Sequence, residues 1–142
     1  MSLMQNGHYS IKFDSTIENL EKVEAVAAKI SEELLFSESD VDDISISITE
    51  LFNNAIHHGN QNDLSKKIYV TFDVTPSAIR VSVRDEGHGF SVNDLKDPLA
   101  PENLLAESGR GIYLVRELMD NVEVNTSTNG TEIVIYKNLP KK

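Results

Sequence analysis

The sequence predicts an α/β (α+β) fold: a two-layer sandwich in which helices cover one face of a mixed, largely antiparallel sheet. Three observations lead to this prediction. Two long segments of the first half carry apolar residues at helical spacing, whereas five shorter segments alternate apolar and polar residues as strands do. Short turns join four of the strand segments into two hairpins, and a third helical segment lies between those hairpins. Helices and hairpins in this order bury their apolar faces against each other in two layers.

The first half of the chain is predicted to be one strand followed by two helices. Residues 8–13 alternate apolar and polar side chains, which is typical of a strand. Residues 17–36 carry apolar side chains three or four apart, and the residues before them offer N-cap chemistry. A second helix is predicted over residues 41–58, after a break that contains several capping candidates. Gly59 follows it as a glycine C-cap signature.

The second half is predicted to contain two hairpins with a loop and a helix between them. Residues 90–108 include Pro98, Pro101 and several acids, and we expect a functional loop or lid because few connections are this long. A helix is predicted from Gly111 to Asp120. The strands of the two hairpins are expected at residues 67–74 and 79–84 and, around an Asn129-Gly130 turn, at residues 122–126 and 131–136.

Length and composition limit the classes of protein to consider. We expect one domain over residues 4–142, with Met1-Ser2-Leu3 as a possible expression scar. The chain has no apolar run of membrane-spanning length and no cysteine, so we expect a cytoplasmic protein without disulfides or a thiol nucleophile. The net charge of −10 disfavours direct contact with nucleic acid or an anionic membrane. It also repels a nucleotide, so a nucleotide site here needs a divalent cation, a helix N-terminus and placed cations.

A glycine-rich turn, Asp85-Glu86-Gly87-His88-Gly89-Phe90, follows directly on the predicted strand 79–84. A carboxylate at this position can accept a hydrogen bond from the exocyclic amine of adenine, whereas the carbonyl oxygen of guanine would be repelled. Gly87 and Gly89 would let the base and ribose approach the backbone. The alternative is an ordinary strand-to-loop turn with glycines at positive φ.

Two further groups fit the chemistry of a nucleotide site. Gly109-Arg110-Gly111 stands where a loop enters a helix, and backbone N–H groups there attract phosphate; the alternative is a flexible hinge. Glu50 and Asn54 share a helix face, where Asn54 could bind Mg²⁺ and Glu50 could deprotonate a hydroxyl. The alternative for this pair is a solvated polar face. His57 and His58 are interpreted as helix-end residues, because no acid or cysteine completes a metal site with them.

The order of these pieces is similar to that of the GHKL ATPase superfamily, whose Bergerat ATP-binding fold is shared by DNA gyrase, a heat-shock chaperone, mismatch-repair ATPases and histidine kinases. The matching runs are Glu50 to Ala55, Asp85 to Phe90, Gly109 to Ile112 and Gly130-Thr131. Within the superfamily, the run from Ser108 to Asp120 most resembles the anti-sigma factor serine/threonine-protein kinases of bacteria.

The resemblance implies a role for each matching residue, with ATP and Mg²⁺ as cofactors and residues 90–108 as an ATP lid. The implied roles are general base for Glu50; Mg²⁺ ligand for Asn54; binding of the adenine amine for Asp85, with Gly87 and Gly89 beside the base; phosphate binding for Gly109, Arg110 and Gly111; and support of Asp85 for Thr131.

The function implied is a serine protein kinase that regulates transcription. It would phosphorylate a serine of an anti-sigma factor antagonist and sequester a sigma factor, and it is a possible homodimer, as family members commonly are. Two alternatives remain. One is an ATP-binding module that switches partners without kinase activity. The other is a detached histidine-kinase-type ATPase domain, although no helical segment with a phosphoacceptor histidine fits the sequence.

Overall fold

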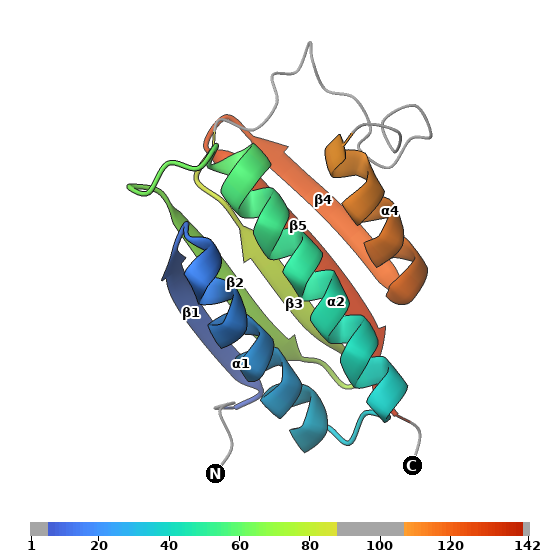
Figure 1. Cartoon of the computed structure of the whole chain (residues 1–142). Coiled ribbons are helices and arrows are strands. Elements are labelled where there is room, and N and C mark those ends of the chain that lie inside the picture. The colour runs from blue at the N-terminus through green and yellow to red at the C-terminus, as the bar shows by residue number, and fades with distance from the viewer. Residues whose placement is uncertain (1–5, 88–106, 141–142) are drawn as a thin grey trace.

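The computed structural model describes residues 6–87 and 107–140, which form one five-stranded sheet with helices on one face (Figure 1). The sheet order is β1-β2-β3-β5-β4, so both hairpins lie side by side through β3 and β5. The strands are β1 (His8–Asp14), β2 (Lys67–Val74), β3 (Ala78–Arg84), β4 (Asn121–Ser127) and β5 (Gly130–Asn138). The predicted two-layer sandwich is confirmed. All the pairings among these strands are antiparallel, so the described sheet lacks the parallel pair that a mixed sheet would contain.

The helices pack side by side on one face of the sheet, with α2 between α1 and α4 (Figure 1). It consists of a 3-10 turn η1 (Ile17–Asn19), α1 (Leu20–Glu33), α2 (Glu38–Asn54), a π-helical turn η2 (Ala55–Gly59) and α4 (Glu107–Leu118). None of the helices within the described ranges is long and apolar enough to cross a membrane.

The sequence of helix α2 explains both where the helix begins and which face it buries. The Ser37 side chain accepts a hydrogen bond from the Asp40 N–H at 3.1 Å and caps the helix. Acidic residues in the first turn favour the positive end of the helix dipole. The apolar side chains recur three or four residues apart and are buried against the sheet: Ile44, Ile48, Leu51 and Phe52.

The core lies between the helices and one face of the sheet. Alternate residues of β2 are buried, namely Ile68, Val70 and Phe72, while the residues between them are partly exposed on the opposite face. Phe52 of α2 meets Phe13 of β1 edge to face, with ring centroids 5.5 Å apart. This packing fixes the C-terminal half of α2 over the sheet, and α2 also contacts β3.

Three boundaries differ from the prediction and affect the site. The second helix begins at Glu38 rather than residue 41, and its α-helical part ends at Asn54, after which η2 continues with wider turns. Helix α4 begins at Glu107, so Gly109, Arg110 and Gly111 lie inside its first turns and not before it. The predicted lid, residues 90–108, falls outside the described residues except for its last two, and so do the first three residues.

Candidate functional site

Asp85 lies buried just past the end of β3, and it is 6% exposed. Its backbone N–H donates to the Thr131 carbonyl oxygen at 3.0 Å. Its Oδ1 atom accepts the N–H groups of Gly87 at 2.9 Å and of Thr131 at 3.1 Å. Within the described residues, Oδ2 has no hydrogen-bond partner. The turn and the β5 strand therefore hold one carboxylate oxygen and leave the other available as an acceptor.

Three glycines surround Asp85 closely enough to exclude any side chain. A Cβ atom on Gly59 would stand 1.9 Å from Asp85 Oδ2, and one on Gly130 would stand 2.3 Å from the Asp85 carbonyl oxygen. A Cβ atom on Gly87 would stand 2.0 Å from the Gly59 carbonyl oxygen. Gly130 alone of these three has a positive φ, +142°. Gly59 and Gly87 are therefore needed for close approach of the backbone and not for an unusual conformation.

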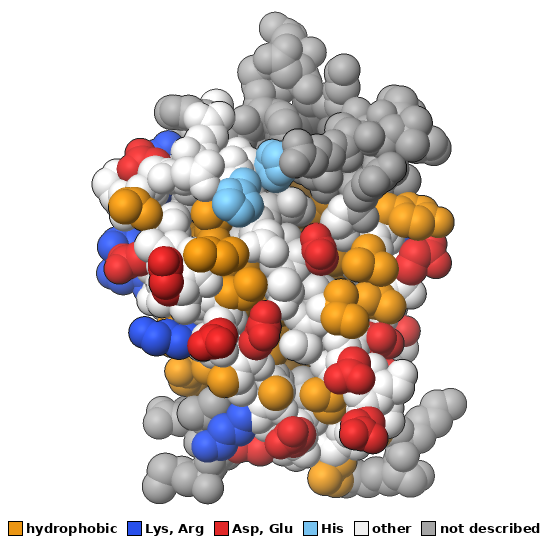
Figure 2. Space-filling model, in the orientation of Figure 1, with side chains coloured by type: hydrophobic (Ala, Val, Ile, Leu, Met, Phe, Trp, Pro, Cys, Tyr) orange, Lys and Arg blue, Asp and Glu red, His pale blue; other side chains and the backbone are white. Residues whose placement is uncertain are grey.

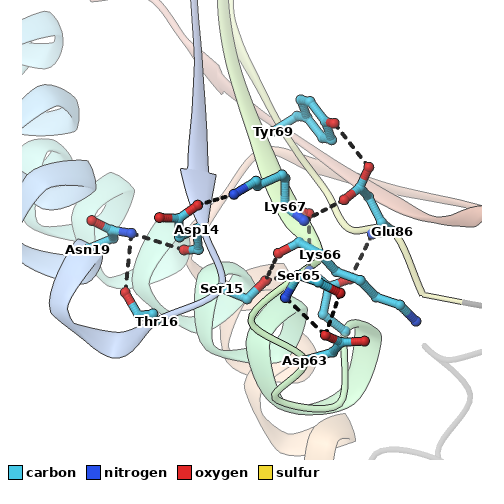
Figure 3. Close-up of polar contacts among 11 residues, drawn as sticks. Asp14, Ser15, Thr16, Asn19, Asp63, Ser65, Lys66, Lys67, Tyr69 and Glu86 are labelled. Carbon is cyan, nitrogen blue, oxygen red and sulfur yellow. Dashed lines mark hydrogen bonds and ion pairs between the residues drawn. The ribbon is translucent and has the colours of Figure 1, made fainter.

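Burial raises the pKa of the Asp85 carboxyl above its usual range, while the two backbone N–H donors act in the opposite direction. The neighbouring Glu86 has the contrary shift. Its carboxylate accepts the Lys67 backbone N–H and the Tyr69 hydroxyl, the latter at 3.0 Å (Figure 3). The hydrogen bond from Lys67 lowers the pKa of Glu86. These two hydrogen bonds hold the Glu86 carboxylate against β2.

Glu50 and Gly111 face each other across the contact between α2 and α4. A Cβ atom on Gly111 would stand 2.7 Å from Glu50 Oε2, so only glycine leaves the carboxylate in its place. Glu50 is half-buried, and so is Asn54, which is the last residue of α2 one turn further along. The structure thus brings Glu50, the predicted base, next to Gly111, one of the residues predicted to bind phosphate.

The end of α2 also carries one buried polar atom for which the described residues offer no partner. Asn53 Oδ1 is buried and, among the described residues, accepts no hydrogen bond. The nearby His57 is exposed and its Nδ1 pairs with Asn62 Oδ1 at 2.8 Å, as expected of a helix-end residue. No group of three or more His, Cys, Asp or Glu in the described ranges could hold a metal ion by itself.

The remaining predicted site residues differ in how much the structure says of them. Thr131 adjoins Asp85 through two backbone hydrogen bonds, as described above. Gly109 and Arg110 lie in the first turn of α4, which begins at Glu107. Gly89 falls outside the described residues.

Sequence reasoning missed Gly59 and Asn60. Gly59 is predicted above as a helix C-cap, but its φ is not positive; the left-handed residues here are Gln61 and Asn62. That prediction is wrong, because Gly59 lies in η2 against the Asp85 carboxylate. Asn60 is fully buried, with a side chain bonded to the turn at Glu86. An Asn directly after a glycine at a helix end, in front of a polar run, is the only local signal.

The helical face of the molecule is acidic. Figure 2 shows many acidic and few basic side chains over the helical layer. Helix α2 alone carries Glu38, Asp40, Asp42, Asp43 and Glu50 and no lysine or arginine. A polyanionic ligand would therefore approach against a negative potential and need a cation to accompany it.

Comparison with known proteins gives one consistent family. The family model described as the histidine kinase-like ATPase domain matches residues 13–137. The serine-protein kinase RsbW of Bacillus licheniformis is 31% identical over 108 residues, which cover 72% of this chain and 68% of that protein. The solved RsbU and RsbW domains of a Mycobacterium tuberculosis protein align with a TM-score of 0.71 and 22% identity, covering 95% of this chain and 33% of that one. The catalytic domain of the histidine kinase ThkA aligns with a TM-score of 0.61 at 16% identity, covering 94% of this chain and 99% of that domain.

Proposed function

The chain belongs to the histidine kinase-like ATPase family, and from this premise we propose that it is an ATP-dependent serine protein kinase. Its proposed substrate is a serine of an anti-sigma factor antagonist, and its second partner is a sigma factor that it sequesters. The observation that carries the proposal is the pairing of a buried acceptor, Asp85, with a half-buried carboxylate, Glu50, at the same end of the helical layer.

Asp85 is proposed to bind the adenine base. Its Oδ2 accepts the exocyclic amine, while Gly87 and Thr131 fix Oδ1 by their N–H groups. A side chain at any of the three surrounding glycines would displace the turn that carries Asp85, so these glycines keep its carboxylate in place for the base. A base with a carbonyl oxygen in place of the amine would set two acceptors face to face, which disfavours it by a few kcal/mol. Gly89 is proposed to lie beside the base as well.

The phosphates are proposed to meet the N-terminal turns of α4. The first N–H groups of a helix have no partners inside it and suit phosphate oxygens, the helix dipole has the matching sign, and Gly109 and Arg110 lie in this first turn. Mg²⁺ is proposed to arrive with the nucleotide and to be bound by Asn54, because a hard cation that keeps its waters and phosphate ligands needs few protein oxygens. Its charge would offset both the phosphates and the acidic surface.

Glu50 is proposed as the general base for the acceptor serine. It stands beside Gly111, near the proposed phosphate site, and is partly accessible to an incoming protein. In phosphoryl transfer, positioning and charge neutralisation do most of the work, and the base orients the hydroxyl and takes its proton. A carboxylate retained at this point favours a kinase over a module that only binds ATP.

The first experiment identifies the product. The protein is incubated with Mg²⁺, γ-labelled ATP and candidate antagonist proteins from the same genome. The proposal predicts label on the antagonist in an acid-stable, base-labile form, which is typical of phosphoserine. An acid-labile label on histidine would support the histidine-kinase alternative instead. ATP binding without transfer to any candidate would support the partner-switching module.

A further inference from the structure

Asn60 is a fully buried polar residue directly beneath the turn that carries Asp85. Its Oδ1 accepts the backbone N–H of Glu86 at 2.7 Å. Its Nδ2 donates to Ser15 Oγ at 2.7 Å and to the Lys67 carbonyl oxygen at 3.0 Å. One side chain thus joins the segment after β1, the start of β2, the end of η2 and the residue next to Asp85.

The partners of Asn60 fix the orientation of its amide. The Glu86 N–H can only donate and the Lys67 carbonyl can only accept, so the oxygen and nitrogen of the amide cannot be exchanged. Ser15 continues the network, because its hydroxyl donates to the Lys66 carbonyl oxygen at 2.6 Å (Figure 3). Every donor of the Asn60 side chain is used, which is what a buried amide needs to be stable in one position.

The π-helical turn is what brings Asn60 and Gly59 to this place. The Asn60 N–H bonds to the Ala55 carbonyl oxygen, five residues back, at 2.8 Å. A continued α-helix would bond four residues back and rotate each side chain by about 100° per residue relative to its neighbour. The wider turn therefore sets the Gly59 backbone against the Asp85 carboxylate and directs the Asn60 side chain under Glu86.

We propose that Asn60 is a positioning residue for base selection, which acts by holding the Glu86 backbone and thereby the Asp85 carboxylate in register with the base. The inference rests on the proposed function, since it takes Asp85 to bind adenine. Hydrogen bonds to Thr131 tie the Asp85 turn to β5 on one side. On the other side, the Asn60 side chain ties the same turn to η2 and to the start of β2. Without the Asn60 side chain, the direction of Asp85 Oδ2 is no longer fixed, although both hydrogen bonds to Asp85 Oδ1 can persist.

The test compares the dissociation constants of ATP and ITP, because ITP carries a carbonyl oxygen where ATP carries the amine. The variants are Asn60→Ala, Asn60→Asp and Ser15→Ala. Asn60→Asp keeps the size but sets an oxygen against the Lys67 carbonyl. The preference is the dissociation constant of ITP divided by that of ATP. We expect this ratio to fall at least tenfold in both Asn60 variants. Ser15→Ala removes one partner and leaves the Glu86 bond, so we expect a smaller loss in the same direction.

Ser31→Ala is the matched control, because Ser31 is also a buried polar residue and its hydroxyl donates to the Ala27 carbonyl oxygen within α1. General destabilisation lowers both affinities together and leaves their ratio unchanged, so the ratio separates positioning from stability. An unchanged ratio in folded Asn60 variants overturns the inference. If neither Asn60 variant folds, an unchanged ratio in Ser15→Ala overturns it. A wild-type protein that binds no nucleotide overturns the proposed function itself.

Discussion

At the scale of single residues, Asp85 has to meet two opposing conditions. Burying a carboxylate is unfavourable unless it is hydrogen-bonded, and the ionised form is the stronger acceptor for an amine. The N–H groups of Gly87 and Thr131 reduce the cost without occupying Oδ2. Burial still prevails, so the pKa of Asp85 is raised. The carboxyl that would select the base is therefore one whose ionisation works against folding.

The raised pKa of Asp85 predicts how binding and stability change with pH. Adenosine, which has no phosphates to titrate, should bind more weakly as the pH falls through the folded-state pKa of Asp85, and this should begin at a higher pH than for an ordinary aspartate. The stability contribution has the opposite sense: it is greatest below the unfolded pKa and is lost as the pH rises through the folded one. Titration calorimetry with adenosine across the acidic range measures the first effect, and urea unfolding measures the second.

Asp85→Asn is the control for both measurements. The substitution keeps an oxygen for Gly87 and Thr131 but cannot titrate, so both pH dependences should shrink relative to the wild type. Equal pH dependence of stability in the two proteins would show that other carboxyls account for it.

Only part of the site could be predicted at the residue scale. Asp85 and Glu50 carry chemistry that local sequence patterns indicate, whereas the role of Thr131 is implied by the family resemblance. The structure places Thr131 within hydrogen-bonding distance of Asp85. Asn60 acts through partners 26 and 45 residues away, Glu86 and Ser15, and no local pattern encodes contacts of that range. Gly59 has the same appearance in sequence whether it ends a helix or leaves room for a carboxylate.

At the scale of elements, the contact between α2 and α4 depends on Gly111. Gly111→Ala places a methyl group 2.7 Å from Glu50 Oε2, which the flexible end of Glu50 can avoid by moving. Because alanine favours a helix over glycine by about 1 kcal/mol, we expect the variant to unfold at higher urea concentration. We also expect phosphoryl transfer to slow by at least about tenfold, since the proposed base is displaced.

A double-mutant cycle gives the control for Gly111→Ala. In a Glu50→Ala background the added methyl group has nothing to displace, so it should cause no further loss of transfer. Full additivity of the two losses would contradict an effect through Glu50.

The end of α1 supplies a test of the fold that does not involve the site. The Phe36 N–H bonds to the Ser31 carbonyl oxygen and the Leu35 N–H to that of Glu32, which is a Schellman ending. Leu35 occupies the left-handed position with φ of +63° and is 80% exposed. Leu35→Gly should relieve strain and stabilise the protein by about 1 kcal/mol, as measured by urea unfolding. A lower stability would show that the Leu35 side chain contributes packing.

Element types were predicted well and element ends less so. Hydrophobic spacing identified both long helices and both hairpins, because burial on one face imposes that spacing. It did not reveal the change from α to π geometry after Asn54, because Ala55 and Ile56 continue the apolar face through η2. It also placed the start of α4 at Gly111, directly before the first apolar residue of the helix face, although the helix begins at Glu107.

At the scale of the whole molecule, the hydrophobic core and the proposed site occupy different parts of the fold. The core lies along the length of α2, and the proposed site lies at one end of it, where α2, η2, β3 and β5 meet. The acidic helical face then requires a counter-charge for ATP, which Mg²⁺ and the N-terminal turns of α4 are proposed to supply (Figure 2). The lid and Gly89 stay predictions.

The most direct test of the central claim is the rate of phosphoryl transfer in a single turnover, with ATP and Mg²⁺ bound in advance and the antagonist protein then added. The comparison is between the wild type and Glu50→Gln, with ATP affinity measured for both. We expect Glu50→Gln to bind ATP as tightly as the wild type and to transfer phosphate about 10²- to 10⁴-fold more slowly, as for loss of a general base. Equal transfer rates in the two proteins would contradict the assignment of Glu50.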